Sequence, residues 1–359
     1  MPPQTIRFCQ TRDGVRLAYA SEEGQGPPLV RAAHFLTHLE FDIETPVWRP
    51  WLQELNRGHQ LLRYDGRNCG LSDSSATEPT LDDWVADLEA VVDAAGLERF
   101  TLFGCSQGCA ISIAYAVRHP ERVSALILFG GYLRGIQRRQ LAPEQLREAS
   151  LMLDLVELGW GRENPAFRQV YTSLFIPGGT LEQMQWFNEL ERRSTTPANA
   201  LRTLRTLSDL DVSVQAGQVR CPTLVLHARG DARVPFEEGR RVAGAIPGAQ
   251  FVPLDSRNHV LLEDEPAFAQ CMDQIRDFMV RHGQAEAEPR LDLTPREHEL
   301  LELLAHGLDN LQIAAHLGLA EKTVRNKVSA VFDKLQVETR AQAIVKARVA
   351  GYGLKALPR

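Results

Sequence analysis

The sequence has no apolar run long enough to span a bilayer and no apolar N-terminal stretch typical of a signal peptide. Its six cysteines are few for 359 residues, and none forms a CxxC pair or a Cys/His array with zinc spacing. A membrane protein, a disulfide scaffold and a zinc module are therefore not expected. Hydrophobic residues make up 44% and charged residues 24%, as in an average globular protein. We expect a cytoplasmic protein with neither a metal nor a cofactor.

Lysine is missing from residues 1–321, and all five lysines lie in the last 40 residues. Residues 1–289 hold 29 basic and 38 acidic side chains, a net charge of −9, whereas residues 290–359 hold 11 and 8, a net charge of +3. This shift predicts a domain boundary, and its sign indicates that the C-terminal part meets a polyanion. Between these parts, residues 281–292 (RHGQAEAEPRLD) are polar and are predicted to form a linker.

Before the linker, short apolar runs alternate with amphipathic stretches. The helical patterns include Thr80–Ala95 and Cys109–Arg118. Runs that are apolar throughout suit strands buried on both faces of a parallel sheet, so the alternation predicts a doubly wound α/β sheet. Residues 132–218 lack strand signals and predict a helical lid inserted between two strands. The expected strands are Val15–Ala20, Pro28–Ala33, Gln60–Tyr64, Phe100–Phe103, Ala125–Phe129, Thr223–His227 and Gln250–Pro253.

Residues 100–108 read FTLFGCSQG, which places a G-x-S-x-G motif between an apolar strand and a helix. Such a sharp turn exposes the Ser106 hydroxyl, and its small residues let neighbouring backbones pass closely. A serine nucleophile also needs a base and a group that orients the base. Asp231 and His259 follow two later predicted strands, in loops at the carboxyl edge of the sheet. The order therefore predicts a triad of Ser106, Asp231 and His259.

With these motifs, residues 1–280 resemble an α/β-hydrolase that carries a lid. YDGRNCGLSD (64–73) resembles the D-x-R-G-x-G-x-S loop of that family, and HPERVSALILFGGY (119–132) resembles the helix and strand after the elbow. The resemblance implies an oxyanion hole formed by the N–H of Gln107 and a second N–H, from Phe35 or His34. The family usually has His-Gly where this chain has Ala33-His34. His34 is then either a ligand contact or an ordinary packed histidine.

The same loop has Asn68 where the family usually has glycine, and asparagine tolerates the left-handed backbone that this turn needs. The lid is rich in aromatic residues, which either line an apolar pocket or pack within the lid. The ligand-pocket candidates are His34, Trp160, Tyr171 and Trp186, with Phe175 and Phe187.

After the linker every segment has a helical pattern. Thr294 and Glu297 form a capping box, with Pro295 in the first turn of a helix that ends near Gly307. Asp309 begins a helix over 310–317, Gly318 ends it, and further helices follow over about 321–335 and 339–350. The core spacing of the short helices leaves one face of the third helix exposed. The predicted core residues are Ile313, Ala314, Leu317, Leu319, Val324, Val328 and Leu335.

Residues 293–347 resemble the LuxR-type helix-turn-helix, by the L-T-P-R-E start, the G-x-x-N before I-A, the T-V that opens the third helix and K-L at its end. The resemblance implies that the third helix enters the major groove of double-stranded DNA. Arg325, Asn326 and Ser329 would approach base edges. The remaining DNA-binding candidates, which would mostly contact phosphates, are Lys322, Thr323, Lys327, Lys334 and Arg340.

Taken together, the sequence predicts a one-component transcriptional regulator with domains at 1–280 and 293–359. Its hydrolase domain would bind a small apolar or aromatic acyl-type ligand, such as an ester, lactone, thioester or amide, and would either hydrolyse it slowly or only bind it. The fourth helix would support a homodimer on a near-palindromic operator. The alternative is a metabolic serine hydrolase whose helical tail only oligomerises.

Overall fold

The computed structural model describes residues 4–21, 26–75, 77–282, 293–335, 337, 339–349 and 352–353. The chain divides into two compact units, residues 1–284 and 285–359, and each unit has a hydrophobic core of its own. The last helix of the first unit extends to His282. Arg281 and His282, the first two residues of the predicted linker, are therefore helical, and the rest of that linker lies outside the described residues.

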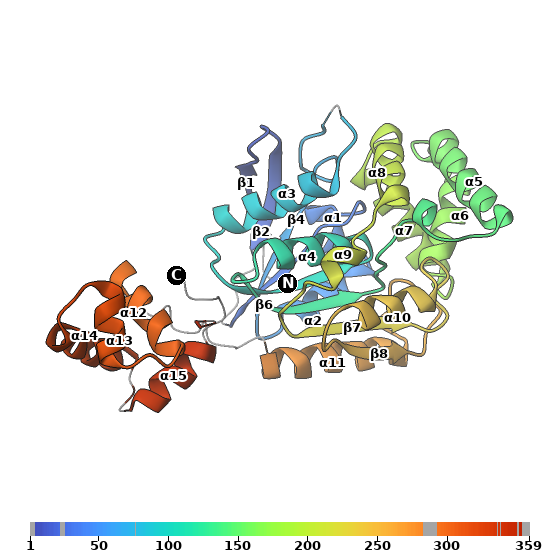
Figure 1. The fold of residues 1–359 in the computed structure, drawn as a ribbon. Helices are drawn as coiled ribbons and strands as arrows, with labels where there is room; N and C mark the ends of the chain where they lie inside the picture. Colours follow the sequence, from blue (N-terminus) through green and yellow to red (C-terminus); the bar gives the residue numbers. More distant parts are fainter. Residues whose placement is uncertain are drawn as a thin grey trace. The chain divides into compact units, whose positions relative to one another are not determined.

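The first unit is built on an eight-stranded sheet in the order β1-β2-β4-β3-β5-β6-β7-β8 (Figure 1). Strands β3 to β8 run parallel, and β1 and β2 run antiparallel at one edge. The central strands β5, β6 and β7 are buried along their whole length, as their uninterrupted apolar runs predict. The bounds are β1 Thr5–Gln10, β2 Arg16–Ser21, β3 Pro28–Arg31, β4 Gln60–Tyr64, β5 Phe100–Cys105, β6 Val123–Phe129, β7 Thr223–Ala228 and β8 Gln250–Leu254.

Helices cover both faces of this sheet (Figure 1). On one face α3 packs against α4, and on the other Trp51 of α2 contacts Phe268 of α11 and Phe129 of β6. The helix expected over Thr80–Ala95 is α3, and a capping box at Thr80 precedes its first residue. The helix bounds are α1 Leu39–Asp42, α2 Trp48–Asn56, α3 Leu81–Ala94, α4 Gln107–Arg118, α10 Phe236–Ala245 and α11 Pro266–His282.

The predicted helical insertion lies between β6 and β7. A short 3-10 turn, η1 (Ile136–Arg138), precedes four longer helices that form the lid. The final short helix packs on α4 and α10 and so rejoins the helical layer of the sheet. The bounds are α5 Pro143–Gly159, α6 Ala166–Phe175, α7 Leu181–Ser194, α8 Pro197–Asp209 and α9 Ser213–Ala216.

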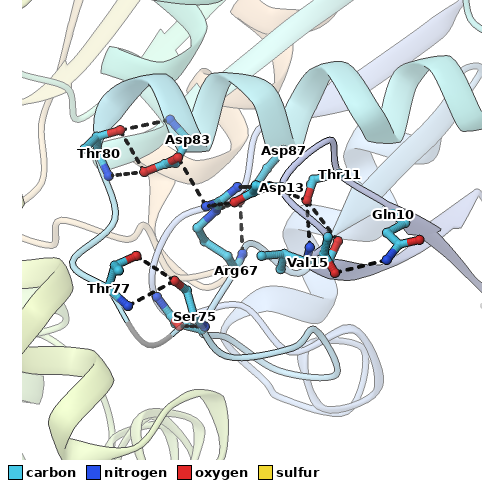
Figure 2. Close-up of polar contacts among 12 residues, drawn as sticks. Gln10, Thr11, Asp13, Val15, Arg67, Ser75, Thr77, Thr80, Asp83 and Asp87 are labelled. Carbon is cyan, nitrogen blue, oxygen red and sulfur yellow. Dashed lines mark hydrogen bonds and ion pairs between the residues drawn. The ribbon is translucent and has the colours of Figure 1, made fainter.

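The loop after β4 is fixed by the Arg67 guanidinium, which Figure 2 shows among several carboxylates. Asp87 of α3 is 1% exposed and lies 2.7 Å from this guanidinium, and Asp13 and Asp83 lie 3.0 and 3.3 Å from it. The next residue, Asn68, adopts φ 70°, so asparagine does take the left-handed position. Thr195 at the end of α7 donates its hydroxyl to the Asn68 carbonyl, which ties this loop to the lid.

The second unit contains the four predicted helices, α12 (Pro295–Ala305), α13 (Asn310–Leu317), α14 (Glu321–Leu335) and α15 (Arg340–Val349). The predicted Thr294 and Asp309 caps are both formed, and Gly318 ends α13 with φ 64°. Of the predicted core residues, five are buried and the two leucines that flank Gly318 are partly buried. No helix within the described ranges is both long and apolar enough to cross a membrane.

Candidate functional site

Ser106 occupies a strained turn between β5 and α4. Its φ of 52° and ψ of −117° lie outside the regions that ordinary residues adopt. The flanking glycines permit the turn, because a Cβ on Gly104 would lie 2.6 Å from the Gly108 carbonyl oxygen. The Ser106 N–H donates to the Phe129 carbonyl of β6 at 2.9 Å. The elbow is thus held in place by the two central strands.

The predicted base and its orienting carboxylate are in contact. His259 Nδ1 lies 2.7 Å from Asp231 Oδ2, and the other carboxylate oxygen accepts the N–H groups of Arg233 and Val234, both at 2.8 Å. Burial alone would raise the pKa of Asp231, but His259 and these donors hold it below its ordinary value. The ionised carboxylate favours the Nδ1–H form of His259, which leaves Nε2 free to accept a proton.

His259 is also held by the lid. Its N–H donates to the carbonyl of Phe175, the last residue of α6, at 2.8 Å, and the Phe175 ring lies 5.3 Å from the imidazole. The imidazole is buried, and its Nε2 has no hydrogen-bond partner among the residues that the structure describes. Ser106 and His259 line the same cavity. The base therefore presents an unused acceptor to the space above the elbow.

The predicted oxyanion hole is partly occupied by the protein itself. The Phe35 N–H donates to Oε1 of the Gln107 side chain at 3.0 Å, and Gln107 is only 4% exposed. One of the two predicted donors therefore already has an acceptor. A developing oxyanion could reach it only by displacing this carboxamide.

His34 lines the cavity as a buried, neutral histidine. Burial lowers its pKa well below the ordinary value, and the charges of Arg31 and His259 lower it further. Arg31 Nη2 lies 2.9 Å from His34 Nε2, and the same guanidinium pairs with buried Asp42 at 3.1 Å. The two alternatives for His34 are thus compatible: its ring is packed and also faces the cavity.

The cavity has a volume of about 490 Å³ and lies between the carboxyl edge of the sheet and lid helices α5 and α6. Tyr171, Phe175 and Phe187 contribute to its wall, as expected. Two predicted pocket residues lie elsewhere. Trp160 packs behind Tyr171 and donates its ring N–H to the Thr195 carbonyl, and Trp186 packs on Phe41. Both tryptophans pack within the lid or against the segment beneath it, so neither side chain is part of the cavity wall.

In the second unit, most candidate DNA contacts are exposed side chains on α14. Arg325, which is 67% exposed, pairs with Glu321 one turn before it at 2.9 Å. The members of this exposed group are Lys322, Thr323, Arg325, Asn326, Lys327 and Ser329.

The other two candidates bond within the unit. Lys334 Nζ lies 2.8 Å from the capping-box residue Glu297. Arg340 donates to the Asn310 side chain at 3.0 Å and to the Leu308 carbonyl, so it joins the start of α15 to the start of α13. Both side chains therefore stabilise the helix arrangement, which their positions in the sequence did not indicate.

Two side chains of the cavity wall were not predicted from the sequence. The Gln107 carboxamide and the Arg233 guanidinium both face the cavity. Gln107 carried a signal, since it directly follows the elbow serine, but its side-chain direction depends on the loop after β3. Arg233 is one of many arginines in the first unit, and only its position two residues after Asp231 distinguishes it. The described residues contain no group of three His, Cys, Asp or Glu side chains placed to hold a metal.

These features define a hydrolase-like domain joined to a helix-turn-helix. The chain belongs to the alpha/beta hydrolase fold family, whose model matches residues 43–266. Residues 291–347 match the model described as bacterial regulatory proteins, luxR family. The chain is therefore a DNA-binding regulator with a hydrolase-like domain.

Similar proteins match the first unit. The chain is 29% identical over 222 residues to "Putative carbamate hydrolase RutD" of Klebsiella pneumoniae, covering 58% of this chain and 79% of that protein. It is 26% identical over 261 residues to AB hydrolase superfamily protein YisY of Bacillus subtilis, covering 72% and 94%. The enol-lactonase of Burkholderia xenovorans LB400 superposes with a TM-score of 0.63 at 20% identity, covering 76% of this chain and 100% of that chain. This last likeness is one of fold.

Proposed function

We propose that the hydrolase domain binds a small apolar acyl-type molecule in its cavity and thereby controls DNA binding by the helix-turn-helix. The observation that carries the proposal is the composition of the cavity wall. The wall is largely apolar and includes the elbow serine and His259 of the Asp231–His259 pair, in a chain that also contains a luxR-family domain. We further propose a cytoplasmic homodimer that reads a near-palindromic operator with Arg325, Asn326 and Ser329.

The proposal includes slow hydrolysis. Ser106 Oγ would attack the acyl carbon while His259 Nε2 takes the hydroxyl proton, and Asp231 would stabilise the resulting imidazolium. The leaving group would take that proton, and water would release the acyl group from the serine. The Asp231–His259 hydrogen bond supports this role, whereas the carboxamide on the Phe35 N–H limits the rate.

The regulator is tested by selection from random DNA duplexes with the full chain, with and without apolar acyl compounds. We expect enrichment of a near-palindromic sequence by the wild type and loss of that sequence specificity in Arg325→Ala. Arg296→Ala is the matched control, because Arg296 is equally exposed and also forms an intrahelical ion pair, but on α12. If the wild type enriches no sequence under either condition, the regulatory proposal is wrong.

Nucleophile activation is tested separately, by intact mass after treatment with a fluorophosphonate. We expect a single adduct on the wild type and none on Ser106→Ala or His259→Ala. A wild-type chain that stays unmodified would exclude hydrolysis through Ser106, and the domain would then act by binding alone.

A further inference from the structure

Arg233 places a guanidinium in the cavity wall close to the predicted base. Its backbone is anchored by the N–H that donates to Asp231 Oδ1 at 2.8 Å. Its guanidinium lies 5.6 Å from the centre of the Tyr171 ring and 5.7 Å from that of Phe175. Since the Phe175 ring also contacts His259, one aromatic residue separates the cation from the triad. Arg233 therefore belongs to the site without being part of the triad.

No carboxylate of the described residues forms an ion pair with Arg233, and the other polar groups near it have hydrogen-bond partners of their own or are neutral. Asp231 is bound to His259, and burial keeps His34 neutral. The second arginine of the wall, Arg139, donates to the Arg134 carbonyl at 2.8 Å and lies 3.8 Å from Glu238. The remaining charged side chain of the wall, Glu148, is exposed on α5. Arg233 thus places in the cavity wall a guanidinium that no carboxylate pairs with directly, and Asp231 acts on it only from beyond ion-pair distance.

A second polar group faces the same space. The Tyr171 hydroxyl is buried beside the Arg233 guanidinium, which lies close enough to interact with its oxygen. No acceptor for the hydroxyl's own proton lies within hydrogen-bond geometry in the described ranges. Burial raises the pKa of Tyr171 to about 12, and the neighbouring cation opposes that rise. The hydroxyl is therefore protonated and available as a donor. A buried donor without an acceptor costs free energy, which an acceptor on a ligand would recover.

We propose that the ligand of this cavity is an apolar molecule that carries a carboxylate, and that Arg233 and the Tyr171 hydroxyl bind this carboxylate. A guanidinium donates two parallel hydrogen bonds to a carboxylate, and the hydroxyl adds a third donor. The rest of the molecule lies in the apolar wall, in a volume suited to a ligand of drug-like size. The inference rests on the proposed ligand-binding function and narrows its ligand to anions.

The test uses straight-chain acids from butanoate to decanoate and phenylalkanoic acids, each paired with its primary amide. Dissociation constants are measured by calorimetry on the full chain carrying Ser106→Ala, so that no probe is hydrolysed. We expect the best acids to bind about tenfold or more tightly than their amides. Adding Arg233→Gln should bring each acid and its amide to within about twofold of one another.

Two further variants separate recognition from folding. Arg229→Gln is the matched control, because Arg229 is exposed on the same loop and lies over the Phe236 ring. It should keep the preference for acids. Tyr171→Phe keeps the ring and removes the hydroxyl, so it should weaken acid binding several-fold and weaken amide binding less, because a bond to a charged acceptor is the stronger one.

The inference is overturned if no acid binds more tightly than its amide, which includes the case in which no probe binds. It is also overturned if Arg233→Gln retains the preference. DNA selection by the same proteins is scored independently. Failure of DNA binding would refute the regulator and leave the acid preference standing, whereas loss of the preference alone would refute the carboxylate site.

Discussion

At the scale of single residues, the Gln107 side chain affects the reactivity expected at the elbow, although the backbone of the elbow has the geometry of a nucleophile turn. Its backbone N–H begins α4 beside Ser106, as an oxyanion donor should, while its carboxamide oxygen accepts the N–H of Phe35. In the proposed oxyanion hole, the same residue thus supplies one donor and blocks the other. Hydrolysis then requires the carboxamide to rotate away before an acyl oxygen can enter.

We expect Gln107→Met to accelerate acylation of Ser106 about tenfold or more. Methionine has a similar length but no strong acceptor, so the Phe35 N–H becomes available, and one oxyanion donor is typically worth about 100-fold or more. The measurement is the second-order rate of fluorophosphonate labelling by intact mass. Ser106→Ala serves as the unreactive control. An unchanged or slower rate in Gln107→Met would show that the carboxamide does not limit the reaction.

The individual site residues were predictable where chain order carries the information. Ser106, Asp231 and His259 each follow a strand whose carboxyl end lies at one edge of the sheet, so topology alone brings their loops together. Side-chain direction is a different matter. Whether an aromatic residue such as Trp160 reaches the cavity depends on the orientation of the lid helices about their axes. The apolar residues of a lid can pack against either the sheet or a ligand, and their sequence pattern does not distinguish the two.

At the scale of elements, Arg67 joins the loop after β4 to α3 (Figure 2). We expect Arg67→Ala to lower the free energy of unfolding of the first unit by about 3–5 kcal/mol, because Asp87 would remain buried without its cation. Arg16→Ala removes an exposed pair with Asp73 and should cost less than about 1 kcal/mol. Urea unfolding followed by tryptophan fluorescence measures both, since all five tryptophans lie in this unit. Equal costs would show that burial of the Arg67 pair is unimportant.

In the second unit, the capping box of α12 predicts a pH dependence. The Lys334 ammonium and the Thr294 N–H hold the pKa of Glu297 at about 2, below its ordinary value of 4.5. The folded state thus favours the ionised form, so this stabilisation is complete above pH 4.5 and is lost as the pH falls toward about 2. The melting temperature of the second unit should therefore be higher for wild type than for Glu297→Gln at pH 7, and the difference between the two should shrink in acid. A difference that does not change with pH would contradict this assignment.

Elements were predictable from sequence in proportion to their burial. The buried central strands show unbroken apolar runs, and the caps of α12 and α13 fix where those helices begin. Strand β1 was not predicted, because its side chains are mostly exposed and its apolar alternation is limited to Ile6 and Phe8. It forms by pairing with β2 at the sheet edge, and that long-range contact leaves little trace in local composition.

At the scale of the whole molecule, the division of charge between the two units predicts how DNA binding responds to salt. We expect affinity to fall steeply with salt, because phosphate contacts release counterions. In a dimer, Lys327→Ala should make the slope of log affinity against log salt shallower by about two. Lys334→Ala should change it less, since that ammonium is bound to Glu297. Equal slopes for wild type and Lys327→Ala, measured by fluorescence anisotropy, would remove Lys327 from the phosphate contacts.

The hydrogen bonds between lid helix α6 and the loop that carries His259 have a consequence for the order of ligand entry and cleavage. The carbonyl that ends α6 accepts the N–H groups of His259 and of the next residue, Val260, at 2.8 and 3.2 Å. Moving α6 outward to admit a large ligand would break these bonds and release the loop that carries the base. The domain would then be catalytically inactive while the lid is open and active only once the lid has closed. A molecule would therefore be enclosed before it could be cleaved. In a sensor, this order of events would give every enclosed molecule a residence time before cleavage, during which the occupied state could affect DNA binding.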